Sequence, residues 1–175
     1  MKQKADFVLH NLECAVLYTN LYKGKGTKAG WNVEELKTAS VASKDGKIVW
    51  VGNAAELTAN VEILPDTRFY NGEGLTALPG FVDSHTHLVY GGNRADEFEM
   101  RVQGKTYLEI LEAGGGILRT TNAVREMSEG ELFAESAYRL EQAMETGITA
   151  IEIKSGYGLD LENELKMLRV AAMLK

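Results

Sequence analysis

Short apolar runs of strand length dominate the first 75 residues. Residues 5–10 and 13–18 are two such runs. The sharpest signal is residues 41–52, where two strand-like arms flank Asp45 and Gly46, and glycine tolerates the positive φ that a tight hairpin turn requires. We therefore expect residues 1–75 to form a β-rich domain.

The pattern changes after residue 75. Residues 75–87 begin as a nearly continuous apolar stretch, which is typical of a strand buried on both faces. A long polar stretch follows, with a triple glycine at 114–116, and we expect it to be a loop. This part of the chain therefore begins with one buried strand and a long connection.

The remainder alternates between helix and strand. Ser128 and Glu131 have the spacing of a capping box, and apolar residues then recur at helical spacing up to Gly147. The β-branched run 148–154 predicts a strand, and Asp160 is a good N-cap for a second helix. Strand, helix, strand, helix is the order of parallel α/β architecture.

Two β/α units are far fewer than the eight that close a barrel of about 250 residues. We therefore expect an α/β protein that is the front part of a larger one. The last helix ends with its apolar face uncovered, so association as a homo-oligomer or with the remainder of a longer chain is expected.

Composition narrows the class of protein. The chain has 175 residues, 45% of them hydrophobic and 25% charged, with a formal net charge of −6, which argues against a nucleic-acid binder. No apolar run approaches the roughly 18 residues of a membrane span, and the polar N-terminus is unlike a signal peptide. The single cysteine, Cys14, excludes an intrachain disulfide. The sequence thus indicates a cytoplasmic protein that binds neither nucleic acid nor membrane.

His85 and His87 form the strongest chemical motif. On a strand, alternate side chains share a face, so both imidazoles would project the same way and could reach one metal ion. The pair alone is equally compatible with two polar residues at a strand end. Asp83 could lie on the same face, either supporting a ligand or accepting hydrogen bonds from the backbone.

The sequence around this pair, residues 79–87, resembles the first-strand signature of the amidohydrolase superfamily, whose members are metal-dependent hydrolases with a barrel and a small β-sandwich. Three more segments, read in order, narrow the resemblance to the members that open an imidazolone ring in histidine degradation: residues 90–98, residues 107–110 together with 113–117, and residues 152–159. The resemblance implies that the β-rich residues 1–75 are the sandwich-like composite domain, and that residues 76–175 are the first part of a TIM-type (β/α)8 barrel, incomplete in this chain.

The resemblance implies a role for five residues. His85 and His87 would bind one zinc or iron ion, and Arg94, Tyr157 and Tyr107 would bind a small substrate that carries a carboxylate. No catalytic residue beyond the metal ligands is implied. The family completes its metal site with a third histidine and an aspartate from later barrel strands.

Each substrate-binding assignment has a structural alternative. Arg94 could form an ion pair with Asp96 or Glu97, Tyr157 could pack as a turn residue, and Tyr107 could anchor the start of a helix.

The chain's third histidine, His10, lies in the β-rich domain, where it is expected to be structural. Glu152 and Lys154 alternate on the second strand and are expected to form an ion pair or to pack in the barrel.

The implied reaction is hydrolysis of the cyclic amide of 4-imidazolone-5-propanoate to N-formimidoyl-L-glutamate, with these 175 residues expected to be inactive alone. The alternatives are another cyclic-amide hydrolase or aminohydrolase of the superfamily, or a non-catalytic fragment that keeps the fold signature.

Overall fold

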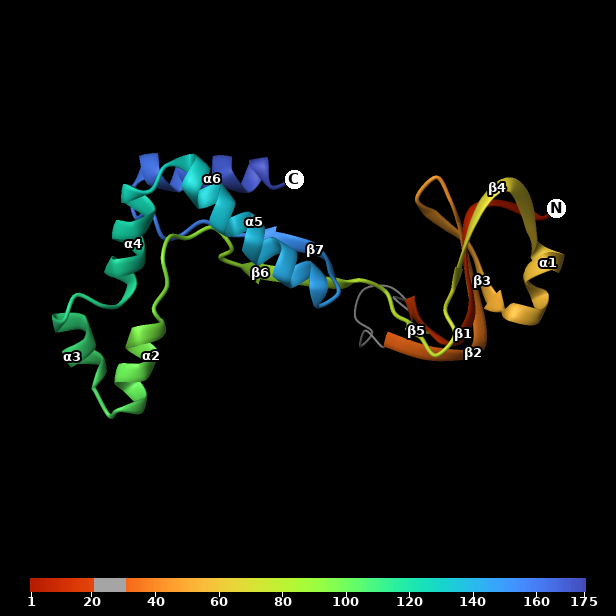
Figure 1. The fold of residues 1–175 in the computed structure, drawn as a ribbon, viewed down its shortest axis with the longest axis horizontal. Helices are drawn as coiled ribbons and strands as arrows, with labels where there is room; N and C mark the ends of the chain where they lie inside the picture. The colour runs from red at the N-terminus through yellow and green to blue at the C-terminus, as the bar shows by residue number, and fades with distance from the viewer. Residues whose placement is uncertain (21–30) are drawn as a thin grey trace, which may run out of the picture. The chain divides into compact units, whose positions relative to one another are not determined.

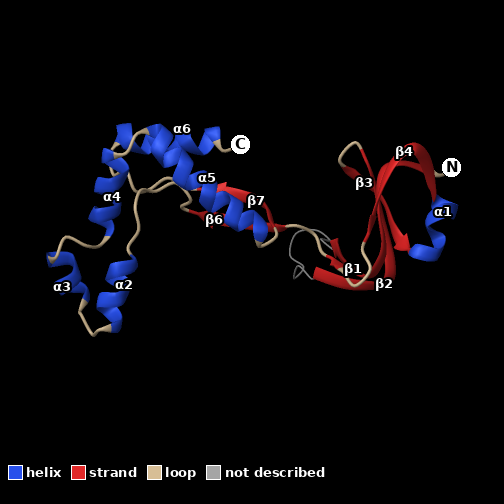
Figure 2. Cartoon of the chain, in the orientation of Figure 1, coloured by secondary structure: helices blue, strands red, loops and turns tan. Residues whose placement is uncertain are grey.

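A computed structural model describes residues 1–20 and 31–175 and divides the chain into two compact units, Met1–Pro79 and Gly80–Lys175 (Figure 1). The first unit is mainly a sheet with one short helical segment, and the second is built from strands and helices (Figure 2). This mixed architecture confirms the α/β class. The domain boundary after residue 75 stays a prediction.

The first unit is organised around one five-stranded sheet. Its strands are β1 (Gln3–Asn20), β2 (Trp31–Lys44), β3 (Lys47–Asn53), β4 (Val61–Asn71) and β5 (Thr76–Ala77). Four of them lie in the order β3-β2-β1-β4, and β5 also pairs with β1. A short 3-10 turn (Ala54–Glu56) and helix α1 (Leu57–Asn60) connect β3 to β4.

The two predicted N-terminal strands are one strand. The β1–β2 register shifts between Leu9 and Leu12, where Asn11 adopts a φ of 58°, so the interruption in the apolar pattern is a β-bulge rather than a turn. The predicted hairpin is confirmed: β2 and β3 are antiparallel, and Asp45 and Gly46 have φ of 51° and 73°.

Both faces of this sheet bury apolar side chains. Val8 and Ala42 are cross-strand partners in one cluster, and their neighbours Leu9 and Val41 belong to the other. Successive residues of a strand point to opposite faces. Leu57 of α1 packs into the first cluster. The sheet therefore has an apolar layer on each side, as expected of a sandwich-like domain.

The second unit contains two strands and five helices in its described residues. They are β6 (Phe81–Thr86), α2 (Ala95–Val102), α3 (Tyr107–Glu112), α4 (Ile117–Glu126), α5 (Glu129–Glu145), β7 (Ile148–Ile153) and α6 (Leu161–Met173). Strands β6 and β7 are parallel neighbours, connected through the helices α2–α5.

Local sequence signals correctly predicted helices α5 and α6 of this unit. Ser128 and Glu131 form the capping box of α5, and α5 ends just before Gly147, which has a φ of 89°. The side chain of Asp160 accepts a hydrogen bond from the Asn163 amide and so caps α6. These helices bury Leu132, Val170 and Met167 in one core with Val89 and Val124.

Two expectations for the start of the unit are wrong. The predicted long loop after residue 87 contains helices α2 and α3, and α4 follows the triple glycine. The apolar stretch 75–87 is divided by Pro79 into β5 and β6, and Phe81 and Val82 of β6 are exposed, because β7 is the one strand that pairs with β6 in the described chain.

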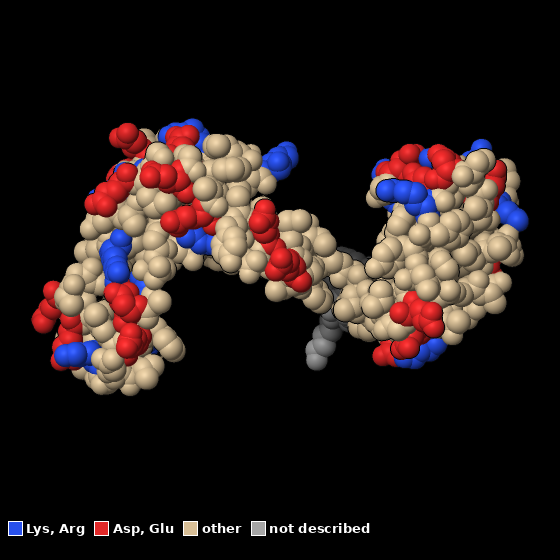
Figure 3. All heavy atoms as spheres, viewed as in Figure 1, with Lys and Arg blue, Asp and Glu red and all other residues tan. Residues whose placement is uncertain are grey.

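Exposed apolar side chains are common in both units. Phe81, Val82, Ile48 and Leu161 are each more than half exposed. In the face shown in Figure 3, broad areas of each unit lack charged side chains. None of the helices in residues 1–20 and 31–175 is long and apolar enough to cross a membrane.

The core of the second unit gives a stability prediction. Leu132 is fully buried, so Leu132→Ala should destabilise this unit by about 2–5 kcal/mol, through lost burial and the cavity left behind. Leu161→Ala, at a helix position that is 76% exposed, is the matched control and should change stability by less than about 0.5 kcal/mol. Urea denaturation followed by circular dichroism would measure both. Equal effects would contradict the assigned core.

Candidate active site

The parallel pairing of β6 and β7 brings their carboxyl ends to one edge. Thr86 and Ile153 are register partners, and the Lys154 amide donates to the Thr86 carbonyl at 2.8 Å. His85 lies on β6 and His87 follows it directly, while Tyr157 lies in the loop after β7. The sequence-predicted residues of the two strands therefore meet at the same edge, where α/β barrels keep their active sites.

The two histidines lie side by side. Their ring centroids are 5.5 Å apart with an interplanar angle of 68°, within reach of a single ion whose bonds to nitrogen would each be ~2.1 Å. The Nδ1 atom of His87 is buried and has no hydrogen-bond partner. Such an orphaned nitrogen suits a metal ligand, so the pair fits two of the four positions of a zinc-type site. No group of three or more His, Cys, Asp or Glu side chains with metal-site geometry occurs within residues 1–20 and 31–175.

Tyr157 packs against His87. Its ring centroid lies 5.3 Å from that of His87 and 6.2 Å from that of Tyr90. A Cβ atom on Gly156 would come within 2.9 Å of the His87 ring, and Gly156 has a φ of 153°, so a larger residue there would collide with the imidazole. The glycine beside Tyr157 thus allows the loop to approach His87.

The segment that follows His87 is fixed by Arg139 of α5. This guanidinium donates to the carbonyl oxygens of Leu88 and Tyr90, at 3.3 and 2.8 Å, and lies 3.6 Å from the centroid of the Tyr90 ring. Leu88 is itself buried. The backbone after the histidine pair is therefore held by a charged side chain from a different element.

A cavity of about 310 Å³ opens beside these rings. It is lined by Tyr90, Asn93, Arg94, Thr120 and Tyr157. Two of the three predicted substrate-binding residues thus share one cavity. The sequence did not single out Thr120, which lies on α4 outside any recognised motif. Tyr90 and Asn93 belong to a segment that resembles the family, but no role was predicted for either residue.

Arg94 also forms the ion pair with Glu97 that the sequence left open as an alternative to substrate binding. Its Nε and Nη2 atoms donate to one carboxylate oxygen of Glu97 at 2.9 and 2.7 Å, and the other oxygen accepts from the Gly116 amide at 3.0 Å. The side chain of Glu97 is only 5% exposed. The hydrogen bond from Arg94 holds the pKa of the Glu97 carboxyl below its usual value, although burial acts in the opposite direction.

Tyr107 lies apart from the cavity lining. It is the first residue of α3, after the Thr106–Glu109 capping box, and it is 65% exposed. Tyr107 therefore stands at the start of a helix, which was the alternative to a role in substrate binding. Its contact with substrate stays a prediction.

Three other polar residues on or beside the strands make local contacts. Asp83 accepts hydrogen bonds from the His85 amide and the Thr86 hydroxyl, which lower its pKa, with the Thr86 contribution the larger. Lys154 and Glu152 form the expected ion pair.

The third histidine has a structural environment as well. His10 lies on β1 of the first unit, with its ring centroid 5.7 Å from that of Phe69 in an edge-on arrangement.

Comparison with curated proteins gives close relatives. The chain is 47% identical over 169 residues to the imidazolonepropionase of Shewanella frigidimarina, covering 97% of the chain and 39% of that relative. It is 53% identical over 140 residues to the imidazolonepropionase of Shewanella sp. strain ANA-3, covering 79% of the chain and 34% of the relative. The chain thus spans well under half the length of these relatives. No protein-family model matches it.

Solved structures show the same fold at low identity. A triazine hydrolase from Arthrobacter aurescens matches 95% of the chain and 33% of its own length, with a TM-score of 0.56 and 18% identity. Escherichia coli guanine deaminase matches 95% of the chain and 34% of its own length, with a TM-score of 0.55 and 16% identity.

A mutant atrazine chlorohydrolase from Arthrobacter aurescens, complexed with zinc and atraton, matches 95% of the chain and 33% of its own length, with a TM-score of 0.50 and 16% identity. The chain is therefore similar in sequence, over most of its length, to part of the imidazolonepropionases, and its fold matches about a third of a triazine hydrolase and of a guanine deaminase.

Proposed function

We propose that this chain is part of an enzyme that hydrolyses the cyclic amide of 4-imidazolone-5-propanoate to N-formimidoyl-L-glutamate in histidine degradation. One observation carries the proposal: the histidine pair, Tyr157 and Arg94 gather around one edge and one cavity, in a chain 47% identical to an imidazolonepropionase. The family's further metal and substrate ligands would come from outside these 175 residues.

His85 and His87 would hold a zinc or iron ion. The mutant atrazine chlorohydrolase of similar fold is complexed with zinc, which supports a divalent metal as the cofactor. A metal there would supply Lewis acidity toward the ring carbonyl and would activate water.

Arg94 would bind the propionate of the substrate. Glu97 occupies donors on Nε and Nη2 alone, so other N–H groups of the guanidinium are left for a second carboxylate. The planar fork of arginine matches a carboxylate through two parallel hydrogen bonds. Because Glu97 is buried and also accepts from Gly116, it fixes Arg94 beside the cavity before substrate arrives.

Tyr157 would place its ring and hydroxyl between the metal-ligand pair and the carboxylate site. It contacts His87 on one side and lines the Arg94 cavity on the other. A phenol both donates and accepts hydrogen bonds, which suits the polar edge of an imidazolone ring.

Substitution of Arg94 tests the substrate assignment. In the complete enzyme, Arg94→Ala should raise KM for 4-imidazolone-5-propanoate by about 10- to 100-fold, because a hydrogen-bonded ion pair to the propionate is lost. Arg94→Lys should restore only part of this. Arg169→Ala, which removes an ion pair with Glu129, is the control and should leave KM unchanged. Steady-state kinetics of ring opening would measure all three; an unchanged KM for Arg94→Ala would remove Arg94 from the site.

Metal binding can be tested on the chain alone. Two imidazoles form half a site, so the 175-residue chain should bind Zn²⁺ weakly, and His85→Gln or His87→Gln should weaken binding at least about tenfold. The matched control is His10→Gln, in the first unit, which should bind as the parent chain does. Calorimetric titration would measure the affinities. Undiminished binding by His87→Gln would contradict the assignment.

The Glu97–Arg94 pair predicts a pH dependence of stability. Because the folded-state pKa of Glu97 is lowered, its ionised form stabilises the fold above the unfolded value of about 4.3, and this contribution is lost as pH falls through the folded pKa. Glu97→Gln should therefore be less stable than the parent at pH 7, with the difference shrinking on acidification.

The matched control is Glu141→Gln, at an exposed position of α5, which should parallel the parent at every pH. Denaturant unfolding from pH 7 down to about 3 would show the trend. A difference between Glu97→Gln and the parent that stays constant with pH would show that ionisation of Glu97 does not stabilise the fold.

A further inference from the structure

The loop that carries Tyr157 has a backbone that local sequence preferences do not favour. Leu159 has a φ of 57°, a left-handed conformation that is unfavourable for a branched apolar residue. Gly158 is buried against α6, where a Cβ atom would lie 2.5 Å from the Glu164 amide nitrogen. Such a conformation persists only where surrounding groups hold it.

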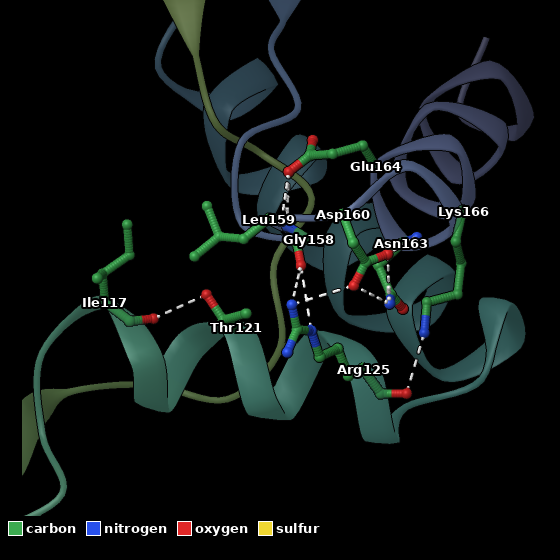
Figure 4. A network of polar contacts seen from close by, with 9 residues as sticks. All are labelled: Ile117, Thr121, Arg125, Gly158, Leu159, Asp160, Asn163, Glu164 and Lys166. Carbon is green, nitrogen blue, oxygen red and sulfur yellow. Dashed lines mark hydrogen bonds and ion pairs between the residues drawn. The ribbon is translucent and has the colours of Figure 1, made fainter.

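Arg125 of α4 holds the loop from one side. Its Nε and Nη2 atoms donate to the carbonyl oxygen of Gly158 at 3.2 and 3.0 Å, and Nη2 also lies 3.0 Å from a carboxylate oxygen of Asp160 (Figure 4). One guanidinium therefore binds the loop carbonyl and the residue that caps α6.

Glu164 of α6 holds the loop from the other side. A single carboxylate oxygen accepts from the amides of Gly158 and Leu159, at 2.8 and 2.9 Å (Figure 4). The first of these amides belongs to the peptide that joins Tyr157 to Gly158. The second belongs to the peptide whose carbonyl oxygen binds Arg125, so that peptide is fixed at both of its polar atoms.

The end of α4, the helix that carries Arg125, is also held by a side chain of α6. Lys166 of α6 donates to the carbonyl oxygen of Arg125, in the last turn of α4, at 3.2 Å, and to that of the C-cap residue Met127 at 3.0 Å. Carbonyl groups at this end of a helix lack helical partners. Helix α4 is thereby tied to α6 beneath the loop, which fixes the point from which Arg125 reaches Gly158.

We propose that Arg125 and Glu164 are positioning residues for Tyr157: by holding the peptides on either side of Gly158, they fix the Tyr157 ring against His87. The role of this placement in substrate binding rests on the proposed function, but the placement itself does not. Neither residue lines the cavity, so each acts through Tyr157.

The test is the position of the His87 signal in a proton–carbon correlation spectrum of the metal-free 175-residue chain at one alkaline pH. The chain has three histidines, so the imidazole signals can be assigned by single His→Gln substitutions, and His10 in the first unit serves as an internal reference. Tyr157→Leu removes the neighbouring ring and defines the full displacement of the His87 signal.

Arg125→Ala and Glu164→Ala should each displace the His87 signal by at least half of that amount, with the His10 signal unmoved. Glu164→Gln should largely restore the parent position, since its amide oxygen can still accept both hydrogen bonds. Arg169→Ala removes an ion pair of similar exposure elsewhere on α6 and should leave the His87 signal in place. A general loss of stability would not produce this pattern.

The proposal is overturned if the His87 signal stays in place in folded Arg125→Ala, or if Arg169→Ala displaces it equally. Should Arg125→Ala or Glu164→Ala fail to fold by circular dichroism, Arg125→Lys decides: one ammonium cannot reproduce the two-atom contact of the guanidinium, so a displaced signal supports the proposal and an unmoved one overturns it. Because no turnover is measured, an enzyme inactive on 4-imidazolone-5-propanoate would contradict the proposed function without changing this result.

Discussion

The candidate site depends on the parallel register of β6 and β7. The pairing of Thr86 with Ile153 sets the strand ends level, so that the histidine pair and the loop carrying Tyr157 emerge at one edge. Because side chains alternate along a strand, a slip of one residue would turn His85 to the opposite face. The contact between the His87 and Tyr157 rings, 5.3 Å between centroids, depends on this register.

Helix α4 connects the two halves of the site. At its start, the Gly116 amide donates to Glu97, which holds Arg94; in its middle, Thr120 lines the cavity; at its end, Arg125 binds the loop of Tyr157. A rigid helix fixes the distance between its ends. The spacing between the carboxylate-binding side and the metal side is thus set by a helix of which only the first residue, Ile117, lies in a family segment.

The sequence predicted elements whose signals are local. The Asp45–Gly46 hairpin, the Ser128 capping box and the Asp160 cap each depend on a few neighbouring residues, and each is present. The sequence did not predict helix α2, because this helix is short and has no side-chain cap. The capping box formed by Thr106 and Glu109 at the start of α3 is a local signal, but it was not used to predict a helix.

The same distinction applies to the site. His85 and His87 stand out as a pair on one strand, and the family resemblance singled out Arg94 and Tyr157, but Thr120, Arg125 and Glu164 act across contacts between elements far apart in the sequence. Burial of β6 on both faces was predicted wrongly because burial depends on neighbouring strands, which an apolar run does not specify.

The charges around Arg94 indicate how a carboxylate would be recognised. Arg94 binds Glu97, and Arg119 binds Asp96 at 2.6 Å while lying 4.0 Å from Glu97, so two cations and two anions cancel formally. The chain as a whole carries a charge of −6. Long-range attraction from these residues would therefore contribute little to the approach of an anionic substrate.

Selection of a substrate that carries a carboxylate would come instead from the fixed geometry of the Arg94 guanidinium, whose remaining donors match a carboxylate only at short range. Under the proposed function, the buried Glu97 contributes orientation to the site rather than charge.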